Sequence, residues 1–238
     1  MPSRSETSGG ASRDEPVALP GAIRRLSPGR VRDDPRLRAL ALSAGLARPR
    51  AILSSAEAAL LVDLARGRRR AVQVGVHEGA SALLLLGALE PGAELHLVDG
   101  FGRPPGAGRH GPPVSERAAR RVVARGARRS SGPTVEWHAG FSAGVTADWT
   151  RPLDLVLIDG DHSEIGVTTD WELWHGFVVP GGSAVFCDAR ASHAGGHGLA
   201  GPTAAVDRLF RGPRAPHDWQ ISAEVDGVVV VTHVPRAA

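Results

Sequence analysis

Short apolar runs alternate along this chain with longer segments of helical periodicity. The apolar runs are nearly continuous, which is typical of strands buried on both faces of a parallel sheet. We expect such strands at residues 71–76, 94–98, 135–138, 153–158 and 184–187. We expect helices at residues 36–46, 54–66, 81–89, 115–129, 168–179 and 203–210. This alternation predicts a doubly wound α/β sheet.

Turn and capping residues refine these boundaries. Ser54 and Glu57 have the spacing of a capping box, which predicts the start of a helix. The Pro-Gly-Gly at 180–182 is expected to end the helix that precedes the fifth strand. An Asp-Gly pair at 226–227 joins two further apolar runs and predicts a hairpin. The antiparallel strands of this hairpin are expected at residues 219–225 and 228–234.

The first part of the chain differs in composition from the rest. Residues 1–35 mix Ser, Gly, Pro, Arg and acids without periodicity, which predicts a disordered leader. Residues 36–238 are expected to form a single domain, in which the first helices cover the sheet edge beside a ligand. The Gly- and Pro-rich segment 100–113 is expected to be a flexible loop.

Composition restricts the location of the protein. Apolar stretches are far shorter than the ~18 residues that span a bilayer, and the first residues lack the apolar core of a secretory signal. The single cysteine, Cys187, excludes an internal disulfide framework. These features favour the cytoplasm.

The sequence pI near 10.6 contrasts with a formal charge of only +3. The chain has no Lys, Asn or Tyr, which is typical of a high-GC genome that encodes its cations as Arg. The pI therefore reflects the high pKa of Arg more than an acidic partner. Arg117, Arg121 and Arg125 lie four apart on one helix and are expected to face solvent. That helix lacks the aromatic residues that stack on bases, which disfavours nucleic acid.

Polar residues follow the fourth strand directly. Asp159, Gly160, Asp161 and His162 stand where the apolar run 153–158 stops. In open α/β sheets, ligands bind at the carboxyl ends of the strands. We therefore expect the functional site at this edge.

The first strand ends in a glycine-containing turn. Gly75 and Gly79 flank His77, and the next helix begins near Ser81, so its positive end would face a ligand. Asp99 follows Gly79 by twenty residues, the spacing at which an acid binds a ribose diol. A full G-x-G-x-x-G is missing, so the turn suits adenosine without a pyrophosphate. This pattern favours S-adenosylmethionine (SAM).

With LVLIDGDHS and PGGSAVFCDAR as its most specific motifs, the chain resembles the class I SAM-dependent methyltransferases over about residues 50–234. Within them it resembles the small-molecule O-methyltransferases, in the branch of macrocin-type and cephalosporin-hydroxylase-like proteins. The resemblance implies a Rossmann-like, seven-stranded sheet that binds SAM across strands one and two.

The resemblance also implies which residues contact SAM. Asp99 would hold the ribose hydroxyls, and Asp159 would lie between cofactor and acceptor. Residues 140–142, where relatives often have Gly-Asp-Ser, would lie near the adenine. Phe141 replaces the usual acid there and could stack on the adenine, offer its backbone or belong to the core. The implied set is Gln73, Gly75, His77, Gly79, Ser81, Asp99, Gly140, Phe141, Ser142 and Asp159.

Metal-dependent relatives have an acid after strand four and an acid pair, or an acid and an amide, after strand five. Asp159 and Asp188 match two of these positions and imply a site for Mg²⁺ or Ca²⁺. Cys187 replaces the remaining ligand, and Mg²⁺ tolerates sulfur poorly.

Asp161 and His162 are the candidate general bases. Sugar-modifying relatives use an acid at the position of Asp161, whereas catechol-type relatives use a lysine at the position of His162. Histidine titrates near neutral pH without tuning, so His162 is favoured if no metal is bound. The alternative is that His162 only orients a loop or caps a helix.

We therefore expect a SAM-dependent O-methyltransferase that acts on a small secondary metabolite or its sugar. Arg190, His193 and His197 follow the fifth strand and either recognise the acceptor or face solvent. The alternatives are a SAM-binding enzyme with a non-methylating reaction, such as cyclisation or a hydroxylase-like one, and an RNA methyltransferase or nucleic-acid binder. The predicted partner is a small-molecule acceptor. No association with a membrane is expected, and the chain could form a homo-oligomer.

Overall fold

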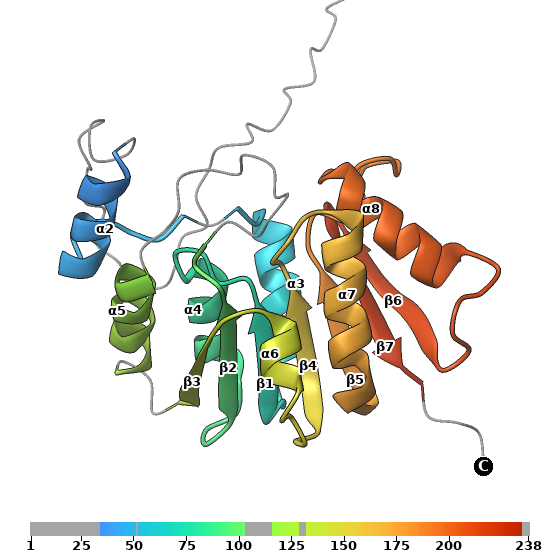
Figure 1. Cartoon of the computed structure of the whole chain (residues 1–238), viewed down its shortest axis with the longest axis horizontal. Coiled ribbons are helices and arrows are strands. Elements are labelled where there is room, and N and C mark those ends of the chain that lie inside the picture. Colours follow the sequence, from blue (N-terminus) through green and yellow to red (C-terminus); the bar gives the residue numbers. More distant parts are fainter. Residues whose placement is uncertain (1–33, 51, 103–115, 129–131, 235–238) are drawn as a thin grey trace, which may run out of the picture.

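The computed structural model describes residues 34–50, 52–102, 116–128 and 132–234. Seven strands form one sheet in this part of the chain (Figure 1). They are β1 (Arg70–Val74), β2 (Glu94–Asp99), β3 (Thr134–Ala139), β4 (Leu153–Ile158), β5 (Val178–Phe186), β6 (Trp219–Val225) and β7 (Val228–His233). Their order is β3-β2-β1-β4-β5-β7-β6, and β7 runs antiparallel to both β5 and β6. The predicted doubly wound sheet with an antiparallel end is confirmed.

Helices pack on both faces of this sheet (Figure 1). The described helices are α2 (Pro35–Ala44), α3 (Ser55–Ala65), α4 (Ala80–Ala88), α5 (Glu116–Ala127), α6 (Ser142–Thr146), α7 (Glu164–Trp174) and α8 (Ala200–Val206), of which α2 packs on α5 rather than on the sheet. Apolar residues of α3, α4 and α5 share one core with the sheet, and those of α6, α7 and α8 share the other. Two short turns follow the helices, a 3₁₀ turn at His175–Phe177 and a π turn at Asp207–Arg211.

The parallel strands are buried on both faces, as their apolar runs predict. In β1, Ala71 belongs to the core under α4 while Val72 belongs to the core under α7. In β4, Leu155 and Val156 divide in the same way. Successive side chains of a strand point to opposite faces, so only a nearly continuous apolar sequence serves both cores.

The structure corrects the predicted boundaries around β5. Helix α7 begins after Ser163, whose hydroxyl caps it, and ends at Trp174, so the expected helix at 168–179 was placed too late. The Pro-Gly-Gly at 180–182 lies within β5 and is not a turn before it. Val178 of β5 pairs with Leu153 of β4, and Ser183 pairs with Leu155. Strand β5 therefore has more residues than β4 between these two pairs, and the register shifts there. Proline and glycine are tolerated there because the regular ladder is interrupted.

Other local predictions are confirmed or fall outside the described residues. Ser54 and Glu57 form the predicted capping box at the start of α3, and the hairpin of β6 and β7 turns at the Asp-Gly pair. Arg125, expected to face solvent, instead donates hydrogen bonds to the Leu42 and Ser43 carbonyls at the end of α2. The predicted leader and the Gly/Pro-rich loop lie almost entirely outside the described residues.

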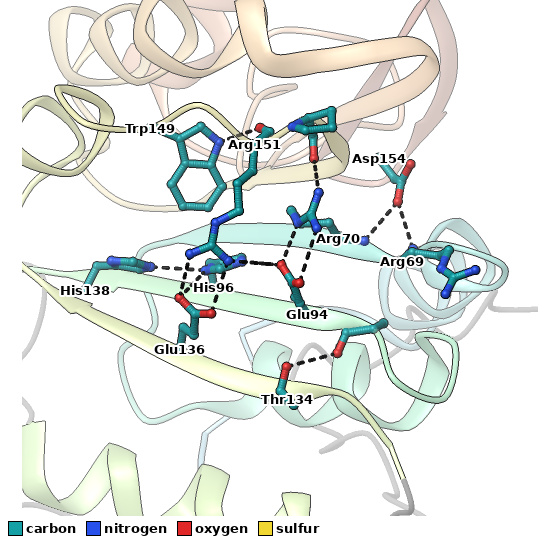
Figure 2. A network of polar contacts seen from close by, with 12 residues as sticks. Arg69, Arg70, Glu94, His96, Thr134, Glu136, His138, Trp149, Arg151 and Asp154 are labelled. Carbon is teal, nitrogen blue, oxygen red and sulfur yellow. Dashed lines mark hydrogen bonds and ion pairs between the residues drawn. The ribbon is translucent and has the colours of Figure 1, made fainter.

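A polar network ties together the beginnings of β1, β2 and β3, at the end of the sheet opposite the carboxyl edge of the strands (Figure 2). Arg70 Nε donates to Glu94 Oε2 at 2.6 Å, and Arg151 contacts both Glu94 and Glu136 at 3.2 Å. Hydrogen bonding by the Arg70 guanidinium lowers the pKa of Glu94 to about 2. The carboxylate of Glu94 is therefore stabilised in the folded chain.

Replacing Glu94 by glutamine is expected to make the stability of the folded chain depend less on pH in the acid range. The ordinary pKa is 4.5, so the stabilisation by Glu94 is complete above that pH and is lost as the pH falls towards 2. The effect is modest because the pair is partly exposed to solvent. Melting temperatures measured between pH 6 and about 3 should fall more steeply for the wild type than for Glu94→Gln. Parallel curves for the two proteins would contradict this assignment.

Candidate functional site

A cleft of about 1050 Å³ lies at the carboxyl ends of the parallel strands. Ligand sites for small molecules usually measure about 300–1,000 Å³, so this cleft has room for a cofactor and a second molecule. Residues that follow β1, β2, β3, β4 and β5 line it, together with residues from α7 and from the segment before α3. The site therefore lies at the edge that the sequence predicted.

The turn after β1 brings two strand ends into close contact. Gly75 has a φ of +82°, and a Cβ there would lie 2.0 Å from the Asp159 backbone oxygen. Only glycine allows β1 and β4 to end this close together. Gly79 also has a positive φ and begins α4, and His77 and Ser81 line the cleft. Gln73 is buried and donates a hydrogen bond to the Gly75 carbonyl at 2.8 Å. Neither Gln73 nor Gly79 lines the cleft, although the sequence predicted both as cofactor contacts.

Asp99 at the end of β2 fixes the conformation of the turn. Its Oδ2 accepts hydrogen bonds from the backbone N–H groups of Val76, at 2.8 Å, and His77, at 3.0 Å. Its Oδ1 accepts one from the Phe101 N–H at 2.6 Å. The side chain also lines the cleft, where the sequence predicted a ribose contact. Asp99 thus organises the turn besides facing the cleft.

The segment after β3 forms another end of the cleft. Gly140, Phe141 and Ser142 all line it. Phe141 is 56% exposed, so the alternative that it belongs to the core is wrong. Its ring packs over Gly100, where an added Cβ would lie 2.8 Å from the ring. The aromatic face at this end is therefore open to a ligand.

Asp170 of α7 is a cleft residue that the sequence analysis missed. Its Oδ1 accepts a hydrogen bond from the Ser142 hydroxyl at 2.6 Å, and that hydroxyl accepts one from Trp174 Nε1 at 3.0 Å. Burial raises the pKa of Asp170 to about 6. A signal was present in the sequence, because an acid in an otherwise apolar stripe of a helix requires a polar partner.

Two acids and a histidine converge where β4 and β5 end. His162 Nδ1 lies 3.4 Å from Asp188 Oδ2, and His162 Nε2 lies 3.8 Å from Asp159 Oδ1. The contact with the Asp188 carboxylate raises the pKa of His162 above its ordinary value. Burial, with the charge of Asp188 adding to it, raises the pKa of Asp159 to about 7. The cluster can therefore hold and exchange a proton near neutral pH.

Asp161 lines the cleft beside this cluster but is held differently. Its Oδ1 accepts a hydrogen bond from the Ser163 N–H at 2.9 Å, at the start of α7. The side chain also packs against Gly166, where an added Cβ would lie 2.4 Å from the carboxyl carbon. Both candidate bases therefore reach the cleft, and only His162 contacts the acids of the cluster.

The donor set of this cluster does not fit Mg²⁺. It consists of two carboxylates and one imidazole nitrogen. Cys187, in the place of a further oxygen ligand, is buried beside Asp159, and burial raises the pKa of its thiol well above the ordinary value. Mg²⁺ requires a tight octahedron of oxygen ligands. The residues of this cluster therefore do not match a site for Mg²⁺.

Of the three residues predicted to bind an acceptor, the structure brings only His197 to the cleft. Arg190 turns away and donates to the Asp226 carbonyl at 2.8 Å. His193 lies 2.8 Å from Asp207 Oδ1. These contacts anchor the segment after β5 to neighbouring elements.

His197 contacts Glu57, for which the sequence predicted only a role in the capping box of α3. Its Nε2 lies 3.4 Å from Glu57 Oε1. Glu57 is buried, lines the cleft, and also accepts a hydrogen bond from the Gly227 N–H at 2.8 Å. The start of α3, the hairpin turn and His197 are thus joined at one wall of the cleft.

Comparison with known proteins relates the central part of this chain to methyltransferases. Residues 72–189 match a family model described as a methyltransferase domain. No curated protein sequence matches the chain. The sheet order, with its antiparallel end, is that of the Rossmann-like fold of class I SAM-dependent methyltransferases.

Several solved methyltransferases share this fold. The O-methyltransferase TomG of Streptomyces achromogenes, solved with SAM, is 20% identical, with a TM-score of 0.58 over 85% of this chain and 91% of that one. The O-methyltransferase NovP is 16% identical, with a TM-score of 0.59 over 87% and 94%. An O-methyltransferase of Bacillus cereus, solved with SAH, is 15% identical, with a TM-score of 0.54 over 82% and 89%. No helix in the described part of the chain is long and apolar enough to cross a membrane.

Proposed function

We propose that this chain, in which residues 72–189 match a methyltransferase domain model, transfers the methyl group of SAM to a hydroxyl of a small molecule. One observation carries the proposal: a single cleft contains the glycine turn, Asp99 and the cluster around His162. A secondary metabolite or its sugar is the proposed acceptor. Its support is that TomG, which shares the fold, is described as involved in tomaymycin synthesis.

The cleft residues have distinct roles in this reaction. SAM, when bound, supplies a methyl group on a positively charged sulfur. The turn after β1 and Asp99 orient the cofactor, and the acceptor occupies the space beside His162. Alignment of donor and acceptor contributes roughly 7–11 kcal/mol in well-oriented reactions. His162 takes the hydroxyl proton at Nε2 while Asp188 holds the ring at Nδ1. With the proton on His162, the acceptor oxygen would take the methyl group from the sulfur, which would leave S-adenosylhomocysteine (SAH).

Calorimetry with SAM and SAH tests the cofactor assignment directly. We expect both to bind, and absence of binding by both would remove the proposal. Mass spectrometry of products formed from candidate phenols, alcohols and sugars tests the reaction. A product heavier by one methyl group supports methyl transfer. A product without that increment would support the alternative of a non-methylating reaction on the same fold.

Chelation is expected to leave the reaction intact. The cluster of Asp159, His162 and Asp188 does not offer Mg²⁺ an oxygen octahedron, and His162 supplies the base without a metal. Turnover measured after dialysis against EDTA should therefore equal turnover before it. Loss of turnover that added Mg²⁺ restores would contradict this prediction.

A further inference from the structure

Asp170 presents an unusual combination of contacts at the end of the cleft near Phe141. Its Oδ1 is occupied by the Ser142 hydroxyl, and Ser142 is in turn bonded to the Trp174 indole. The hydroxyl donates one hydrogen bond and accepts another, so these two bonds fix its orientation. They also fix the orientation of the Asp170 carboxylate, which lines the cleft.

The second oxygen of Asp170 has different surroundings. Among the described residues, none donates a hydrogen bond to Oδ2. A Cβ added at Gly160 would lie 3.4 Å from this oxygen, so glycine there leaves it uncovered. Because Asp170 lines the cleft and Oδ2 is not among the buried polar atoms without a partner, this oxygen is accessible from the cleft, where a ligand or water can donate to it. A ligand in the cleft could therefore donate a hydrogen bond to Asp170 Oδ2.

The proposed cofactor places such a donor at this end. The strand β3 lies beside β2, so with the ribose at Asp99 the adenine would extend towards the end of β3. There the exposed Phe141 ring offers a face for stacking but no acceptor for the adenine amino group. Asp170 and Phe141 line the same cleft.

We propose that Asp170 accepts a hydrogen bond from the 6-amino group of adenine through Oδ2, and so replaces the acid that position 141 lacks. This inference rests on the proposed function, because it assumes that SAM occupies the cleft. It assigns adenine recognition to α7, while the segment after β3 provides a stacking face and holds the carboxylate in place. Selection for adenine then depends on one carboxylate oxygen.

A SAH analogue with hydrogen in place of the 6-amino group tests the proposal. Calorimetry should show that the wild type binds SAH at least about tenfold more tightly than this purine analogue, since the analogue leaves Oδ2 unpaired. This comparison needs no variant. Equal affinity for the two ligands would overturn the proposal.

Asp170→Asn provides the matching variant. The amide oxygen can still accept from Ser142, which leaves the amide nitrogen, a donor, facing the adenine amino group. We expect weaker SAH binding and loss of the preference over the purine analogue. Thr169→Val, at the neighbouring cleft residue of α7, is the control and should keep the preference.

The outcomes separate this inference from the proposed function. Binding of SAH with a preference that Asp170→Asn abolishes and Thr169→Val retains would support the role of Asp170. A preference that survives in Asp170→Asn, with that variant folded as judged by its melting temperature, would overturn it. If the wild type binds neither SAH nor the purine analogue, the cofactor assignment is overturned, and this inference with it.

Discussion

Replacing His162 by glutamine is expected to lower kcat by about 10²–10⁴-fold, the usual contribution of a general base. Glutamine cannot take up the hydroxyl proton, although it fills similar space beside Asp159 and Asp188. The affinity for SAM should be unchanged, because the residues proposed to bind the cofactor remain. Turnover of the acceptor, together with calorimetry for SAM, separates the two effects.

Asp161→Asn is the matched comparison, since Asp161 lines the same cleft and is the other candidate base. A loss of kcat in Asp161→Asn equal to that expected for His162→Gln, with His162→Gln active, would reverse the assignment. The pH profile adds a second readout. The base acts unprotonated, and Asp188 raises the pKa of His162 above 6.5, so kcat should rise through a pKa above that value. The rise should be missing in His162→Gln.

The sheet and its functional edge could be predicted because local sequence determines them. A strand buried on both faces needs a nearly continuous apolar run, and β4 has one that stops at Asp159. The turn after β1 needs glycine because the backbone of Asp159 leaves no room for a side chain. Such requirements act on single positions or short segments, and they are visible without knowledge of the fold.

Other parts of the site depend on packing between distant segments. Asp170 and Ser142 meet only because α6 packs on α7, so neither position by itself indicates a contact. Arg190 and His193 were predicted from their place after β5, yet hydrogen bonds to neighbouring elements turn both away from the cleft. A loop position therefore predicts proximity to a site better than it predicts the direction of a side chain.

Helix α2 is joined to the turn after β1 by a buried ion pair. Glu78, between His77 and Gly79, has a side chain only 1% exposed. Arg38 of α2 donates to both of its oxygens, at 2.9 and 2.6 Å, and the Arg50 N–H donates at 2.7 Å. Burial favours the neutral acid, but the hydrogen bonds from Arg38 and Arg50 outweigh it and lower the pKa of Glu78. Glu78 is thus a buried anion that depends on its partners.

Arg38→Met should therefore lower the free energy of unfolding by about 3–5 kcal/mol, because it leaves a buried carboxylate without its cation. Arg66→Met is the matched control. Arg66 pairs with Asp63 on the surface of α3, where both side chains are more than 60% exposed, and exposed pairs contribute about 0–1 kcal/mol. Urea unfolding of the two variants measures the difference. Equal losses would contradict a special role for the buried pair.

A double variant shows whether the cost arises from the unpaired charge. Glutamine at position 78 removes the charge and can still accept from the Arg50 N–H, so Arg38→Met with Glu78→Gln should be more stable than Arg38→Met alone. Because Glu78 belongs to the turn that is proposed to bind SAM, Arg38→Met should also weaken SAM binding, although Arg38 does not line the cleft. Loss of the Arg38–Glu78 pair would then act on the proposed SAM site through the turn that contains Glu78.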